Sequence, residues 1–240
     1  MASNPPLTMS LLDLRTAAKQ RASMENSPFI SDAEWNANIN SSYARLYDRL
    51  VTLYGEDYFV KDPAYTFTTD GTSESYPLPT DFYKLLGVDV QMSSGPQGWM
   101  PIRPFQFQER NRYNLPLGLV YTGSLNLRYR LTANKLWLIP TAASGQTIQI
   151  RYVPRLTPLV NDTDIADGYS GWLDLVTVDA AIKALRKQQL DASELMADKA
   201  ELIKEIEDAA VNRDAALPQT VGDNRHAHDP WPFLGFGGDW

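Results

Sequence analysis

The sequence predicts an α+β fold in which N- and C-terminal helices form one helical core around an inserted β-rich domain, followed by an extended C-terminal tail. Apolar residues recur with helical spacing near both ends, and short alternating segments lie between them. The last residues mix aromatic side chains with proline and glycine. The expected parts are the N-terminal helices (1–57), the inserted domain (58–160), the C-terminal helices (161–217) and the tail (218–240).

Two helices are predicted in the N-terminal part. Ser10 precedes an apolar run with Asp13 three residues on, and Ser31 precedes Glu34 in a capping box of the S-x-x-E type. After the second cap, Gly55 is suited to end the helix. The apolar residues of this second helix fall on one face. They are Trp35, Ile39, Leu46, Leu50 and Leu53.

Short strands are predicted in the inserted domain. Alternation from Tyr65 to Thr69, followed by Asp70-Gly71, predicts a two-residue hairpin that returns through Leu78. We expect a helical turn at Phe82–Leu85 and then a strand at Gly87–Gln91. Further expected elements are helical turns within Pro104–Arg112 and strands at Leu125–Leu131, Lys135–Ile139 and Thr147–Val153. Together these elements predict a small antiparallel sheet or barrel.

Helical spacing returns in the third part. Apolar residues from Trp172 to Leu185 begin it, and Ala192 to Asp214 is strongly helical in composition. The pattern fits either one long helix or two helices broken near Asp191. Pro218 ends this helical segment. The seven-residue spacing of the apolar residues in the segment suits packing against another helix.

The final twelve residues are too apolar for a solvated linker. Prolines and glycines among them exclude a helix, and each exposed large apolar side chain costs roughly 1.5–3 kcal/mol. We therefore expect this segment to be buried against its own domain or a partner chain. Its large apolar side chains are Trp231, Phe233, Leu234, Phe236 and Trp240.

The composition does not favour an enzyme. The 240 residues include no cysteine and only two histidines, His226 and His228, whose spacing offers a weak metal site that we do not favour. We expect no catalytic residue, cofactor or metal. No apolar run is long enough for a membrane span, and the N-terminal sequence lacks a secretory signal pattern, so we expect the chain to stay where it is made. A net charge of −7 argues against a surface built mainly for nucleic acid.

Charged residues leave alternatives open. Asp162, Asp164 and Asp167 resemble a catalytic carboxylate group, but a polar linker entering a helix N-terminus explains them more simply. Arginines on the predicted strands suggest, in order of preference, a solvated sheet face, pairing with an acidic helix of a neighbouring subunit, or a nucleic-acid platform. The residues proposed for intersubunit pairing are Arg128, Arg130, Arg151 and Arg155 with Asp198, Glu201 and Glu205.

Several segments, in their order along the chain, resemble head–tail adaptor (connector) proteins of tailed bacteriophages. The segments are Ala33–Asn36, Tyr43–Tyr47, Tyr54–Tyr58, Tyr76–Asp89, Tyr129–Pro140 and Ile150–Leu159. The order and spacing match over roughly residues 30–215. The large β-rich insertion departs from the helical-only adaptors.

The resemblance implies a structural virion protein at the head–tail interface, assembled in the host cytoplasm. Such adaptors usually form a dodecameric ring below the portal, extend the DNA channel without binding DNA specifically, and receive a tail, nozzle or stopper protein on the far side. In related adaptors a C-terminal extension docks along the portal. The matching segment here is Leu217–Trp240, with no membrane involved.

Two other functions stay open from the residues alone. A binding module for carbohydrate or single-stranded nucleic acid would use Tyr113, Tyr121 and Trp137 with the strand arginines. A hydrolase would use the three aspartates Asp162, Asp164 and Asp167.

Overall fold

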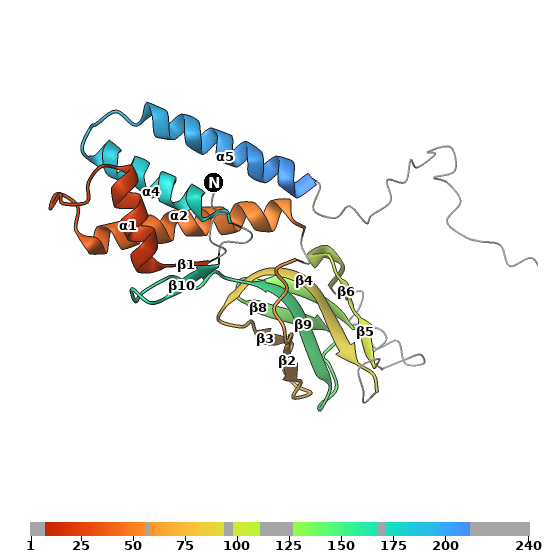
Figure 1. Ribbon diagram of the computed structural model, residues 1–240. Coiled ribbons are helices and arrows are strands. Elements are labelled where there is room, and N and C mark those ends of the chain that lie inside the picture. The colour runs from red at the N-terminus through yellow and green to blue at the C-terminus, as the bar shows by residue number, and fades with distance from the viewer. Residues whose placement is uncertain (1–7, 56–57, 94–97, 111–126, 168–170, 212–240) are drawn as a thin grey trace, which may run out of the picture.

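Helices near both ends of the chain and strands between them give a mixed α+β fold, which confirms the predicted class (Figure 1). The computed structural model describes residues 8–55, 58–93, 98–110, 127–167 and 171–211. The helices in these ranges are α1 (Leu11–Arg21), α2 (Asp32–Leu53), α4 (Leu173–Lys187) and α5 (Ser193–Val211). None of these described helices combines the length and the apolar character that crossing a membrane requires.

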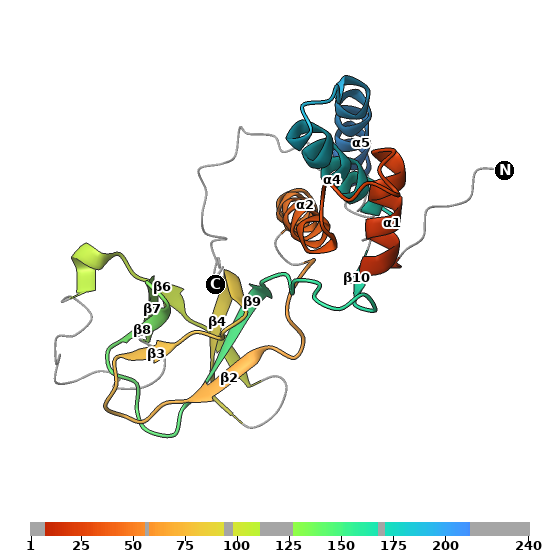
Figure 2. The same ribbon diagram turned by 90° about the vertical axis from the view of Figure 1, so that its left-hand side faces the viewer.

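Helix α4 is the centre of the helical bundle and contacts the other three helices. Figure 2 shows α5 beside α4, with α1 and α2 on opposite sides of the bundle. One apolar cluster joins all four helices, because each contributes an apolar stripe at helical spacing. Its members include Leu14 and Ala18 of α1, Trp35 and Ile39 of α2, Val176 and Ala180 of α4, and Ile206 of α5.

Both predicted N-caps form, but only one is a complete capping box. Ser10 Oγ accepts a hydrogen bond from Asp13 N at 3.1 Å, and Asp13 Oδ2 accepts one from Ser10 N at 3.3 Å. Ser31 Oγ accepts one from Glu34 N at 3.3 Å. The Glu34 carboxylate instead contacts Lys187 Nζ of α4 at 2.6 Å. An opposite charge on a neighbouring helix thus replaces the expected reciprocal bond.

The C-terminal helical pattern is two helices, which settles the alternative left open by the sequence. Helix α4 ends with Gln188 as its C-cap, and Gln189 has φ of +59°. Asp191 then accepts hydrogen bonds from the backbone N and the hydroxyl of Ser193, both at 2.9 Å. Because this carboxylate binds the residue at which α5 begins, the chain reverses near Asp191, where the break was predicted.

Within the described ranges, the strands form two four-stranded sheets and one two-stranded ribbon. The first sheet has the order β2 (Tyr65–Thr68), β9 (Thr147–Pro154), β4 (Phe82–Gln91), β5 (Trp99–Pro101). The second has the order β3 (Ser75–Pro77), β8 (Lys135–Ile139), β7 (Arg128–Thr132), β6 (Arg103–Pro104). Their pairs are antiparallel except β6–β7. Both sheets share one apolar core, including Val88, Ile148 and Ile150 of the first and Leu136 and Leu138 of the second.

The predicted hairpin at Asp70-Gly71 is wrong. Strand β2 pairs with β9, whereas β3 pairs with β8 in the other sheet. The Asp70 carboxylate accepts hydrogen bonds from the backbone N of Thr72 at 2.9 Å and of Ser73 at 2.7 Å. Gly71 has φ of +82°, and a Cβ there would lie 2.9 Å from Ser144 Cβ. The turn residues were therefore recognised correctly, but this turn carries the chain from one sheet to the other.

Two further corrections concern strands. The helical turn predicted at Phe82–Leu85 is wrong, because strand β4 runs from Phe82 to Gln91 with register irregularities between Phe82 and Lys84 and between Leu85 and Gly87. The ribbon of β1 (Thr8–Ser10) and β10 (Ile165–Asp167) was not predicted. Strands of three residues carry too little alternation to detect. Of the helical turns predicted in Pro104–Arg112, the described part contains the 3₁₀ turn η1 (Phe107–Glu109).

The β-rich domain meets the helices along strand β9. Ile150 and Tyr152 point to the β core, so Val153 lies on the opposite face, where it packs against Tyr47 and Val51 of α2. Tyr47 Oη donates a hydrogen bond to the Pro154 carbonyl at 2.7 Å. Burial raises the pKa of Tyr47 to about 12, so this hydroxyl remains a donor at neutral pH.

We predict that Tyr47→Phe lowers the free energy of unfolding by about 1–2 kcal/mol, because the Pro154 carbonyl loses its hydrogen-bond donor. Urea denaturation measures this loss. Tyr65→Phe is the control, since the Tyr65 hydroxyl makes no hydrogen bond within the described residues, and it should change stability by less than about 0.5 kcal/mol. Equal effects of the two variants would contradict this role for Tyr47.

Candidate functional site

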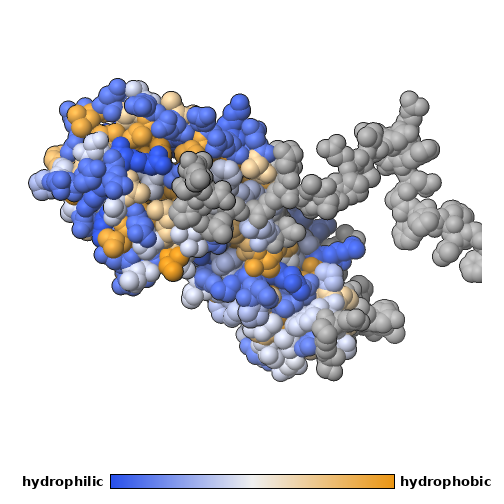
Figure 3. Space-filling view, viewed as in Figure 1, coloured by the Kyte–Doolittle hydropathy of each residue, from blue (hydrophilic) through white to orange (hydrophobic). Residues whose placement is uncertain are grey.

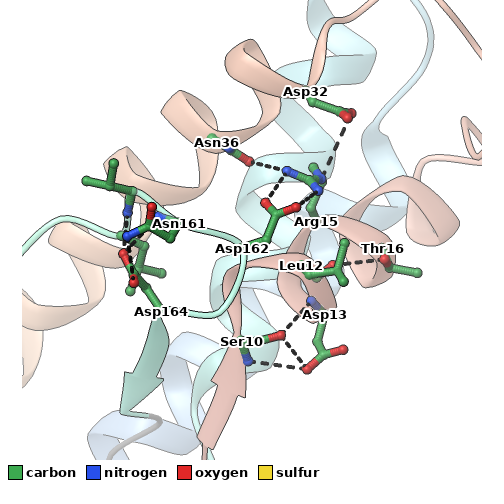
Figure 4. Close-up of polar contacts among 12 residues, drawn as sticks. Ser10, Leu12, Asp13, Arg15, Thr16, Asp32, Asn36, Asn161, Asp162 and Asp164 are labelled. Atoms are coloured by element: carbon green, nitrogen blue, oxygen red, sulfur yellow. Dashed lines mark hydrogen bonds and ion pairs between the residues drawn. The ribbon is translucent and has the colours of Figure 1, made fainter.

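Two of the three aspartates considered for hydrolysis, Asp162 and Asp164, are held by structural contacts of their side chains (Figure 4). Arg15 of α1 makes a bidentate pair with Asp162, with both N–O distances 2.9 Å, and also contacts Asn36 of α2. The Asp164 carboxylate accepts hydrogen bonds from the backbone N of Asn161 and Val160, which holds the pKa of Asp164 below its usual range. This geometry fixes the turn before β10.

The same region modifies the simpler interpretation of these residues. Asp162, Asp164 and Asp167 precede or lie in β10, and the linker meets the N-terminus of α1, where the Asp164 carbonyl accepts a hydrogen bond from Leu11 N at 2.9 Å and the Asp162 carbonyl accepts one from Leu12 N at 3.2 Å. Tyr43 Oη accepts a hydrogen bond from Asp167 N at 3.0 Å, which ties β10 to α2. No group of acidic or histidine side chains in the described ranges has the arrangement of a metal site.

The most concentrated charge cluster lies between α2, α4 and α5 around Asp179. The Asp179 side chain is only 7% exposed. Its oxygens contact Lys199 Nζ at 2.6 Å, Ser42 Oγ at 2.7 Å, Lys183 Nζ at 3.2 Å and an Arg45 guanidinium nitrogen at 3.8 Å. We did not predict this cluster; the available signal was an acid on the buried face of an apolar helix.

The electrostatics of Asp179 follow from these contacts. Burial by itself raises the pKa of Asp179, but the hydrogen bonds from Lys199 and Ser42 and the charge of Lys183 outweigh burial and lower the pKa to about 2. Desolvation lowers the pKa of Lys183, and the charge of Asp179 opposes this effect. The carboxylate is therefore ionised at neutral pH and links three helices.

A cleft of about 240 Å³ opens beside this cluster. Three basic side chains and three apolar ones contribute to its lining. The residues lining it are Ser42, Arg45, Leu46, Arg49, Leu175, Asp179, Lys199 and Ile203. We call it the basic cleft.

The acidic residues predicted for intersubunit pairing lie together on the other flank of α5. Asp198, Glu201 and Glu205 are exposed and line a shallow depression with Arg21, Asp174 and Leu202. Arg21 pairs with Asp174 at 3.2 Å. Asp198, Glu201 and Glu205 make no ion pair with any described residue. We call this surface the acidic flank.

The strand arginines predicted to pair with these acids have different surroundings. Arg151 pairs with Asp89 within the same sheet at 3.2 Å. Arg128 and Arg130 are half-buried, and Arg130 contacts the Phe105 carbonyl at 3.4 Å. Arg155 is exposed and lines a groove of about 320 Å³ that also includes Asp48 and Tyr83. Pairing of these arginines with a second subunit stays a prediction.

An aromatic and basic cluster lies on the second sheet. The Phe107 ring, 46% exposed, lies 6.1 Å from the Trp137 ring and below the guanidinium of Arg110 at 4.4 Å. Arg130 approaches the same ring at 5.7 Å. Trp137, predicted for binding, is thus placed among basic residues; its predicted companions Tyr113 and Tyr121 lie outside the described residues.

The predicted docking tail also lies outside the described residues. This applies to Trp231, Phe233, Leu234, Phe236 and Trp240, and equally to His226 and His228. Their roles stay predictions.

Comparison with known protein families identifies the family of this chain. A family model described as SU10 adaptor protein matches residues 9–222, which includes all the described helices and strands except the start of β1. No curated protein matches the chain.

We predict that Asp179→Asn lowers the free energy of unfolding at pH 7 by about 2–3 kcal/mol, because it leaves Lys183 and Lys199 without their counter-charge. The pKa of Asp179 is lowered on folding, so its contribution is present above about pH 4 and is lost as the pH falls towards 2. The difference in the free energy of unfolding between the unaltered chain and Asp179→Asn should therefore become smaller as the pH falls over that interval. Thermal and urea unfolding at several pH values measure it.

The control for this prediction is Asp174→Asn on the same helix. Its pair with Arg21 is about half-exposed, so the loss should stay below about 1 kcal/mol. A difference for Asp179→Asn that is small at pH 7, or that grows below pH 4, would contradict the central role of Asp179.

Proposed function

The chain belongs to the SU10 adaptor protein family, and on that premise we propose that it is the head-to-tail adaptor of a tailed bacteriophage. In this proposal it forms a homo-oligomeric ring, dodecameric by resemblance, that joins the portal to a tail, nozzle or stopper protein. The ring extends the DNA channel, and DNA passes through it without specific binding. The family match over residues 9–222 carries the proposal.

The fold supports a structural role in an assembly. Members of a structural adaptor family are normally not enzymes, and the carboxylates Asp162 and Asp164 are engaged by Arg15 and by backbone amides. Charged surfaces lie on two flanks of α5. Figure 3 shows hydrophilic residues over much of the bundle, with hydrophobic residues between them. Such a surface suits polar contacts between subunits.

We assign separate roles to the parts of the chain. The helices of 1–57 and 161–217 form the body of the ring, because they share one apolar cluster. The β-rich part, 58–160, has its own apolar core and contacts neighbours or tail proteins. The tail, 218–240, binds the portal through its apolar side chains, since a few buried aromatic residues supply most of the free energy in peptide docking.

We predict that deleting residues 229–240 leaves the body folded but abolishes attachment to DNA-filled heads. The thermal unfolding midpoint should stay within about 2 °C, and binding to heads should fall at least about a hundredfold, as expected when several buried aromatic contacts are lost. Cosedimentation of the purified chain with heads measures binding.

The control is His226→Ala with His228→Ala, which changes the segment just before the deleted residues and retains the tryptophan and phenylalanine side chains of the tail. This control should bind like the unaltered chain. Undiminished attachment of the deletion variant would contradict the assignment of the tail to the portal.

A second candidate function rests on the cluster of Phe107, Trp137, Arg110 and Arg130. Aromatic rings beside guanidinium groups are the components of single-strand nucleic-acid or carbohydrate platforms. As an adaptor, the chain should give no saturable binding in titrations with oligonucleotides or glycans at physiological salt. Micromolar binding that is lost in Phe107→Ala would favour the binding module instead.

A further inference from the structure

The two flanks of helix α5 differ in charge because of their position on the helix. Lys199 and Ile203 are four residues apart and face α2 and the basic cleft. Asp198, Glu201 and Glu205 repeat at spacings of three and four and face the end of α1. Figure 2 shows α2 and α1 on opposite sides of the bundle, so the two charged surfaces point in different directions.

The basic side chains around the basic cleft outnumber the carboxylates that they contact among the described residues. Arg45, Lys183 and Lys199 all approach the single carboxylate of Asp179. Arg49 pairs separately with Glu207 at 2.6 Å. The Arg45 side chain is 66% exposed, and its distance of 3.8 Å from Asp179 is the longest in the cluster. Its guanidinium is therefore accessible to a second carboxylate from outside the chain.

The acidic flank has an excess of negative charge, which is complementary to the basic cleft. Asp198, Glu201 and Glu205 have no basic partner in the described part of the chain, and Arg21 is already paired with Asp174. A glutamate side chain has a length and polarity suited to the basic cleft. Its methylene groups would contact Leu46, Leu175 and Ile203, and its carboxylate would reach Arg45 and Lys199.

Complementary surfaces on two sides of one chain favour a heterologous contact, in which each copy presents a different surface to each neighbour. Such contacts produce a ring when the rotation between copies closes. A different protein would fit both surfaces only if it carried an acidic surface and a basic surface in the same relative positions. A second copy of this chain carries both surfaces in these positions because its fold is the same.

We infer that the acidic flank of one copy, centred on Glu201, binds the basic cleft of the next copy at Arg45 and Lys199. This inference rests on the proposed ring and names its subunit contact. Asp198, Glu201 and Glu205 keep their proposed intersubunit role, but their partners become Arg45 and Lys199 of the helical bundle in place of the strand arginines. The β-rich domain then remains available for other partners.

Charge exchange tests the contact in the full-length chain. Arg45→Glu and Glu201→Arg should each weaken self-association at least about tenfold, since each brings like charges together. The chain with both substitutions should recover association. An equimolar mixture of the two single variants should also associate, because each then complements the other. Sedimentation velocity over a range of concentrations, with and without portal rings, measures these effects.

Two controls separate this contact from a folding defect and from the alternative interface. Thermal unfolding of each variant reports whether the bundle is intact, and Arg45→Gln removes the charge without adding an acid beside Asp179. Arg155→Glu reverses an exposed arginine on the β-rich domain and should leave association unchanged. Loss of association in Arg155→Glu but not in Arg45→Glu would overturn the inference.

Cross-linking gives a second readout, because the chain contains no cysteine. A mixture of Arg45→Cys and Glu201→Cys chains on portal rings, treated with a short bismaleimide, should give cross-linked dimers. Arg155→Cys mixed with Glu201→Cys should not. Attachment to portals without the first cross-link would overturn the contact and leave the adaptor function standing, whereas failure to attach would count against both.

Discussion

The buried carboxylate of Asp179 is the interaction on which the helical bundle depends. It lies on α4, the helix that contacts all the others, and holds Lys199 of α5 and Ser42 of α2 within 2.7 Å. Helix α2 from the N-terminal part and helix α5 from the C-terminal part therefore both contact the Asp179 carboxylate. A buried acid requires compensation by hydrogen bonds and cations, so the positions of α2 and α5 relative to α4 are strongly constrained. The basic cleft is the open side of this arrangement.

The placement of the other parts follows from the bundle. Helix α2 carries Tyr47 and Val51 on a side that Asp179 does not use, and these residues hold strand β9 through Val153. The ion pair of Arg15 with Asp162 joins helix α1 to the segment before β10. Strand β4 adds a second attachment, because Tyr83 Oη donates a hydrogen bond to Asp48 of α2 at 2.9 Å. The β-rich domain is thus attached through β9 and β4 and keeps its own core. In the proposed ring, this division leaves one part for subunit contacts and another for different partners.

Sequence patterns predicted the elements whose signal is local and long. Ser10, Ser31 and Gly55 marked helix ends, and the spacing from Trp35 to Leu53 marked a buried face. The hairpin at Asp70 was wrong because a turn signal does not specify which strands pair. The Asp179 cluster was missed because Ser42 is 137 residues away and Lys199 is on another helix, and no spacing rule connects either of them to Asp179. The pair of Asp179 with Lys183 does follow the i,i+4 spacing, but such a pair alone does not indicate a buried cluster. The intersubunit role of Asp198, Glu201 and Glu205 stays a prediction, and we propose the basic cleft as their partner in place of the strand arginines.

The central claim is that this chain assembles as a ring on a portal. Mass photometry of portal rings incubated with the full-length chain tests it most directly. We expect a single added mass that is a fixed multiple of the 27.0 kDa subunit and that saturates at one ring per portal. Portal rings of unchanged mass, or a continuous distribution of added subunits without a closed end point, would contradict it.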